Sequence, residues 1–122
     1  MNKEEILKLG PGIHKIDVEK SIDVLFEIDD KVARATPSLL PLKSPEKLSH
    51  FLIKEHNTDN YLMNDNEGNI VGYLSVLDFD ENTLEVLNLG TDPDFQGKGF
   101  GKTMMDFAEE IAKGKNKNKS FS

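Results

Sequence analysis

Residues 91–102 read Thr91-Asp92-Pro93-Asp94-Phe95-Gln96-Gly97-Lys98-Gly99-Phe100-Gly101-Lys102. An apolar, strand-like run precedes this stretch, and a helix-like run from Thr103 to Ala112 follows it. Glycine lets the main chain approach a ligand closely, and the N–H groups of a first helical turn have no partner within the helix. A strand that passes through a glycine-rich turn into a helix is therefore suited to holding phosphate.

Two common nucleotide-binding motifs fail here on their spacing. A P-loop, G-x-x-x-x-G-K-[ST], would end at Gly101-Lys102-Thr103 and would need glycine at position 96, where Gln96 stands. The dinucleotide fingerprint G-x-G-x-x-G does not fit Gly97-Lys98-Gly99-Phe100-Gly101, and no downstream strand ends in an acidic ribose ligand. Neither motif explains the stretch.

The stretch resembles the acetyl-coenzyme A loop of the GNAT N-acetyltransferase superfamily. The family motif Gln/Arg-x-x-Gly-x-Gly/Ala is matched by Gln96-Gly97-Lys98-Gly99-Phe100-Gly101. The family commonly places x-Pro-x-aromatic before it, which is matched by Asp92-Pro93-Asp94-Phe95, although Thr91 replaces the usual valine. The turn at residues 65–72 also resembles the family's hairpin before its third strand. The resemblance covers about residues 13–113.

The order of the expected elements agrees with this resemblance. Helical spacing of apolar residues predicts a helix from Val18 to Ala35, broken by Thr36-Pro37 and Pro41, and Ser44-Pro45-Glu46 is typical of a second helix start. Strands are expected at residues 13–16, 61–63, 70–79 and 83–90, and short turns join the last three into an antiparallel meander. The expected fold class is α/β (α+β): a mixed, mainly antiparallel sheet with helices on both faces, GNAT-like and truncated at its C-terminus.

Composition limits the classes of function. The chain has 122 residues, which suits one domain, with 37% hydrophobic and 30% charged residues, too polar for a membrane span. It has no cysteine and a net charge of −7, so phosphate repulsion argues against nucleic-acid binding. These features favour a cytoplasmic protein with no membrane or nucleic-acid partner.

The resemblance implies ten residues that bind the cofactor, acetyl-CoA, as co-substrate. Main-chain groups at Leu89, Gly90 and Thr91 would pair with the pantetheine arm. Backbone N–H groups of the glycine loop would face the pyrophosphate, helped by the helix dipole. The lysines would neutralise phosphate from outside or would simply be solvated. The loop residues are Gln96, Gly97, Lys98, Gly99, Phe100, Gly101 and Lys102.

Acetyl transfer to an amine also needs a base and an oxyanion donor. Glu85, eleven residues before Gln96, stands where some relatives have a catalytic glutamate, but a solvent-facing strand carboxylate is an equal reading. Asn88 either orients substrate or water or is an edge-strand asparagine. The three histidines, His14, His50 and His56, have no partner at ligand spacing, so no metal is expected.

The sequence thus predicts an N-acetyltransferase that acts on a primary amine of a small molecule or protein. The alternative is a truncated, non-catalytic module that binds CoA or a protein partner. The expected domain spans 1–113, incomplete by comparison with the family, and 114–122 form a polar, lysine-rich tail with a strand barely begun at Ser120-Phe121-Ser122. The fourth strand is then an open edge. We expect a fragment or early stop, a homodimer through that edge, or a partly disordered end.

Overall fold

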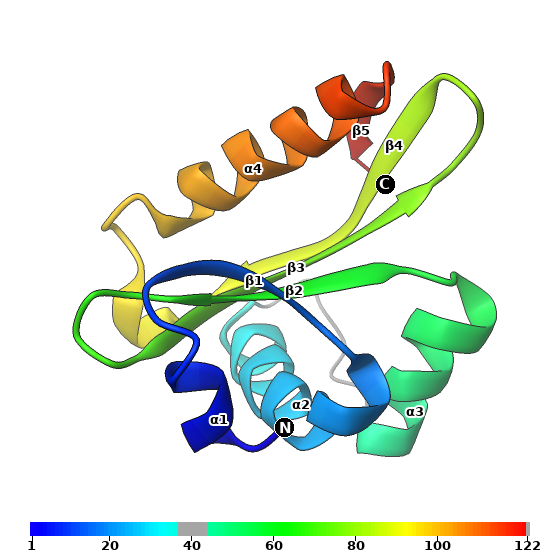
Figure 1. Ribbon diagram of the computed structural model, residues 1–122. Helices are drawn as coiled ribbons and strands as arrows, with labels where there is room; N and C mark the ends of the chain where they lie inside the picture. The colour runs from blue at the N-terminus through cyan, green and yellow to red at the C-terminus, as the bar shows by residue number, and fades with distance from the viewer. Residues whose placement is uncertain (37–43, 122) are drawn as a thin grey trace.

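The computed structural model describes residues 1–36 and 44–121 (Figure 1). The predicted break at Pro37 and Pro41 lies outside the described residues. The elements follow one another as α1 Lys3–Leu7, β1 Gly12–Ile16, α2 Val18–Ala35, α3 Pro45–Ser49, the π-helix η1 His50–Glu55, β2 Asp59–Asn64, β3 Ile70–Asp78, β4 Thr83–Thr91, the 3-10 turn η2 Pro93–Phe95, α4 Phe100–Gly114 and β5 Asn118–Phe121.

The five strands form one sheet in the order β1-β2-β3-β4-β5. The first three pairings are antiparallel, and β5 lies parallel to β4. Figure 1 shows α1, α2 and α3 on one face of the sheet and α4 on the other. The predicted mixed, mainly antiparallel sheet with helices on both faces is therefore confirmed.

The long helix α2 has the bounds that its periodicity predicted. The Asp17 side chain accepts a hydrogen bond from the Lys20 N–H and so caps the first turn. Leu25, Ile28 and Val32 recur at helical spacing and are buried against the sheet. The predicted start of α3 is also present, because the Ser44 hydroxyl accepts from the Lys47 N–H and Pro45 stands in the first turn.

Each face of the sheet has its own apolar core. Leu62 and Tyr73 project from the strands into the core beneath α1, α2 and α3. Leu74 and Val86 project into the core beneath α4, where they meet Met104 and Ala108. The alternation of strand side chains therefore decides which helix layer each strand residue packs against.

Two elements differ from the prediction at the ends of the chain. The helix α1 was not predicted, although Asn2 and Glu5 form a capping box immediately before the buried Ile6. At the other end, the strand that the sequence placed at Ser120-Phe121-Ser122 begins two residues earlier, at Asn118. The strand β5 pairs with β4 from Asn118 to Phe121, so the predicted open edge is covered over Thr83–Val86.

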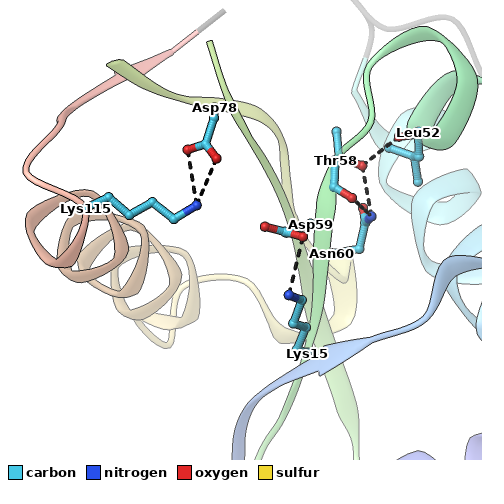
Figure 2. A network of polar contacts seen from close by, with 7 residues as sticks. All are labelled: Lys15, Leu52, Thr58, Asp59, Asn60, Asp78 and Lys115. Carbon is cyan, nitrogen blue, oxygen red and sulfur yellow. Dashed lines mark hydrogen bonds and ion pairs between the residues drawn. The ribbon is translucent and has the colours of Figure 1, made fainter. Parts of the chain in front are cut away.

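Polar contacts hold this end of the chain in place. Figure 2 shows the Lys115 ammonium beside the Asp78 carboxylate, with distances of 3.2 and 3.0 Å to its two oxygens. The Lys117 ammonium lies 3.1 Å from the same carboxylate, and Lys119 lies 3.1 Å from Glu109. The lysines predicted to be a solvated tail therefore fasten β5 to the end of β3 and to α4.

A second polar network joins the π-helix to the sheet. In Figure 2 the Thr58 hydroxyl donates to the Leu52 carbonyl at 2.9 Å, and the Asn60 amide donates to Thr58. The Ser75 hydroxyl donates to the side-chain oxygen Oδ1 of Asn60 at 2.6 Å. This chain of hydrogen bonds links the π-helix to β2 and β3, and Ser75 is the register partner of Asn88 on β4.

Candidate active site

The glycine loop is anchored by Asp92 at the point where β4 ends. The Asp92 N–H donates to the Val71 carbonyl at 2.8 Å, and its Oδ1 accepts from the Asp94 N–H at 2.9 Å. Its Oδ2 accepts from Lys31 of α2 at 2.9 Å, and only 6% of Asp92 is exposed. The Asp92 hydrogen bond is the main reason that the pKa of Lys31 is raised.

The loop then turns through two glycines in the left-handed region, Gly97 with φ 81° and Gly99 with φ 84°. No atom lies within 4 Å of where a Cβ at either position would stand, so the space above the loop is open. Gly99 is the N-cap of α4, and no side chain caps that helix. The first-turn N–H groups of a 15-residue helix therefore point to an open, positively polarised surface.

The strand β4 carries a β-bulge next to this loop. Val86 is opposite Val76 and Asn88 is opposite Ser75, so Leu87 is an extra residue on β4. On the other side of β4, β5 pairs only with Thr83–Val86 within the part of the chain that the structure describes. The edge from Leu87 to Thr91 thus begins at the bulge and leads into the glycine loop.

An open cavity of about 360 Å³ lies between this edge, the loop and α2. Eight of the ten predicted cofactor-binding residues line it, together with Val32 and Thr36 of α2 and with Phe95. The eight are Leu89, Gly90, Thr91, Gln96, Gly97, Gly99, Phe100 and Gly101. Residues of α2, β4, the glycine loop and the first turn of α4 therefore surround one space.

The two predicted lysines lie outside this cavity. The Lys98 ammonium stands 5.7 Å from the centre of the Phe95 ring, and the Lys102 ammonium pairs with Asp106 at 2.9 Å. The side chain of Lys102 is 81% exposed, so that pair is a weak one. Lys98 belongs to the glycine loop and Lys102 to the first turn of α4, so both positive charges favour an anion bound at the loop.

The predicted catalytic residues, Glu85 and Asn88, share the face of the sheet that α2 and α3 cover. Leu84 and Val86 pack beneath α4, so Glu85 between them points to the opposite face. Leu89 also packs beneath α4, which places Asn88 on the same face as Glu85. Residues three apart in a regular strand would face opposite ways, and the extra residue Leu87 brings these two together. Neither lines the cavity.

A buried pair that the sequence did not single out lies under the same strand. The Tyr73 hydroxyl and the Asp29 carboxyl interact with each other, and the two residues are 3% and 8% exposed. Burial raises the pKa of Asp29, Asp30 adds to the rise and Tyr73 opposes it; burial also raises the pKa of Tyr73. One signal was available in the sequence: Asp29 interrupts the apolar face of α2 between Leu25 and Ala33.

None of the three histidines lines the cavity. His14 Nε2 is 2.7 Å from the Gly10 carbonyl, and His56 packs edge-on against Phe51. Over residues 1–36 and 44–121 the structure shows no group of three or more side chains suited to hold a metal ion. Over the same ranges, no helix is both long and apolar enough to cross a lipid bilayer.

Comparison with known protein families gives one match, to the acetyltransferase (GNAT) family, over residues 25–121. No curated protein matches the sequence. The matched range includes α2, the whole of β4, the glycine loop and α4.

Solved structures show the same fold. PaiA N-acetyltransferase from Thermoplasma acidophilum, in complex with coenzyme A, matches with a TM-score of 0.64 and 20% identity over 84% of this chain and 72% of that chain. An acetyltransferase from Trypanosoma brucei matches with a TM-score of 0.61 and 18% identity over 90% of this chain and 80% of that chain. A glucosamine N-acetyltransferase region of a fungal multi-domain GH3 β-N-acetylglucosaminidase matches with a TM-score of 0.73 and 20% identity. The match covers 93% of this chain and 14% of that chain.

Proposed function

This chain belongs to the acetyltransferase (GNAT) family, and we propose that it transfers an acetyl group from acetyl-CoA to a primary amine of a small molecule or protein. The observation that carries the proposal is the cavity beside the α4 N-terminus. Eight residues implied by the family resemblance line it, although the sequence alone could not tell whether they would meet.

The residues at this cavity fit acetyl-CoA as co-substrate. The left-handed Gly97 and Gly99 leave open space above the loop, and the uncapped N–H groups at the start of α4 suit a pyrophosphate. The edge of β4 from Leu87 to Thr91 offers main-chain groups to an extended arm, as in strand addition. A solved structure of the same fold was determined with coenzyme A.

The transfer forms a C–N bond to the acceptor amine and breaks the C–S bond of the thioester. The acceptor must lose a proton, and Glu85 would take it directly or through water, while Asn88 on the same face orients the amine or that water. Main-chain N–H groups near Leu89 would steady the oxyanion. The thiolate leaves with the pantetheine arm. The chain's net charge of −7 favours a cationic acceptor.

A thermal-shift titration with coenzyme A tests the binding part of this proposal. A ligand that binds only the folded state raises the melting temperature by mass action, so coenzyme A at about 1 mM should produce a clear increase. Acetyl transfer to a panel of primary amines then tests the catalytic part. Binding without transfer would favour the non-catalytic CoA-binding alternative, and no shift would contradict both.

The variant Gly99→Asp tests the location of the site. A carboxylate at the start of α4 would repel the pyrophosphate and abolish the shift with coenzyme A. Gly68→Asp is a matched control, because Gly68 has φ 80° and equally open surroundings but lies in the β2–β3 turn. Both variants carry similar backbone strain. Equal shifts in the two variants would mean that the ligand binds elsewhere.

A further inference from the structure

The cavity has two facing walls from different parts of the chain. Val32 and Thr36 of α2 form one wall, and Leu89, Gly90 and Thr91 of β4 form the other. The affinity for an extended ligand arm depends on where the β4 main chain lies relative to α2, since hydrogen bonds weaken steeply with distance and angle.

Tyr73 lies directly beneath Gly90. The two residues are register partners on β3 and β4. A Cβ at Gly90 would stand 2.7 Å from Tyr73 Cε1, 2.8 Å from Cζ and 2.8 Å from the hydroxyl oxygen. The tip of the ring thus occupies the place of a side chain at Gly90 and supports the main chain from below.

Asp29 holds the tip of that ring from the α2 side. Its carboxyl interacts with the Tyr73 hydroxyl, and it lies one turn before Val32 on the same helix. Both side chains are almost fully buried, so the ring has no room to adopt other positions. The Tyr73 ring therefore connects helix α2 to the Gly90 main chain.

We propose that Asp29 and Tyr73 are positioning residues for the cofactor: the Tyr73 ring, packed between α2 and β4, sets the place of the Gly90 main chain, and the Asp29 carboxyl holds the ring there, so that the pair sets the affinity for acetyl-CoA. The pair touches neither the acetyl group nor the amine. It acts on binding of the pantetheine arm in the ground state and in the transition state alike, so its loss raises KM for acetyl-CoA and leaves kcat unchanged. This inference rests on the proposed function.

Three variants separate positioning from general stability. Tyr73→Phe removes only the hydroxyl, Asp29→Leu removes the acceptor, and Asp29→Asn keeps an acceptor for the hydroxyl. Isothermal titration with coenzyme A should show about tenfold weaker binding for the first two, which corresponds to about 1.4 kcal/mol of binding free energy. Asn should restore affinity to within about twofold of the parent chain. KM for acetyl-CoA should follow the same order at constant kcat.

Tyr61→Phe is the matched control, because Tyr61 is the other tyrosine of the chain and packs against Phe107 on the opposite face of the sheet. It should bind coenzyme A like the parent chain. All titrations are made at a temperature where circular dichroism shows each variant folded. If the parent chain binds and Tyr73→Phe and Asp29→Leu bind equally well, the positioning role is refuted and the proposed function stands. If the parent chain itself does not bind, both proposals fail.

Discussion

At the scale of single residues, the candidate site depends on positions where a side chain would be strained or would collide. Gly99 has a left-handed backbone with open space around it, and Gly90 has ordinary backbone angles with an aromatic ring where its Cβ would be. The first position constrains the backbone and the second constrains packing. Substitutions at the two positions should therefore fail for different physical reasons.

Gly99→Ala should lower the free energy of unfolding by about 1 kcal/mol, because a non-glycine residue is strained in the left-handed region. Gly114→Ala is the control within the same helix: its backbone lies outside that region and its surroundings are also open. That substitution should stabilise by about 0.5 kcal/mol. Urea denaturation measures both. A Gly99→Ala variant as stable as the parent chain would contradict the strain.

Asp29 makes stability depend on pH. Its pKa in the folded chain is raised above the unfolded value, so between those two values the folded state binds more protons than the unfolded state, and stability falls as pH rises through that window. Asp29→Asn removes the titrating carboxyl and with it this dependence of stability on pH. The melting temperature of the variant minus that of the parent chain should therefore increase as pH rises above about 4. A constant difference from pH 4 to 7 would argue against the raised pKa.

At the scale of elements, the last strand is held by charge as much as by backbone pairing. The hydrogen bond from Lys115, followed by that from Lys117, lowers the pKa of Asp78. The strand itself has four residues and pairs with only the first part of β4. Such a short strand is expected to open more readily than the centre of the sheet.

Asp78→Asn should weaken the attachment of β5. We expect faster amide hydrogen exchange at residues 118–121 and a loss of about 0.5 kcal/mol in stability, since the carboxylate is half exposed and the pairs are screened by water. The stabilisation by the Asp78 ion pairs is fully present above the unfolded pKa of aspartate. It is lost as pH falls through the lowered pKa of Asp78 in the folded chain. Glu110→Gln is the control, because its exposed pair with Lys113 touches no strand. Equal exchange in the two variants would contradict the role of Asp78.

At the scale of the whole molecule, one sheet separates two apolar cores that belong to different helices. Leu62 and Leu74 are both fully buried, the first beneath α1, α2 and α3 and the second beneath α4. The candidate site lies where the two layers meet, since α2 and the α4 N-terminus both border the cavity. Its geometry therefore depends on both cores.

Leu62→Ala and Leu74→Ala should each lower the free energy of unfolding by about 2–5 kcal/mol, the range for deleting a buried leucine side chain. Because the strands are shared, we expect both variants to unfold in a single transition with an unchanged denaturant slope. Urea titrations followed by circular dichroism and by tyrosine fluorescence test this. Two separate transitions in either variant would show that the layers fold independently.

The local features can be predicted from the amino-acid sequence alone. The bounds of α2, the start of α3, the order of the strands and the sites of the turns all follow from caps, proline, glycine and the spacing of apolar residues, which act over a few positions. The glycine loop was also readable, because Gly97 and Gly99 stand where the backbone must be left-handed. The family follows from the same local motif.

Which of these features lie together depends on contacts between distant parts of the chain. The bulge at Leu87 turns Asn88 to the face of Glu85, and it depends on pairing with a strand ten residues away or more. The contact of Asp29 with Tyr73, and that of Lys31 with Asp92, joins residues far apart in the chain. The strand β5 exists because β4 offers an edge and Asp78 attracts two lysines. Such contacts form only when the packed chain closes the long loops between them, and no local propensity encodes that closure.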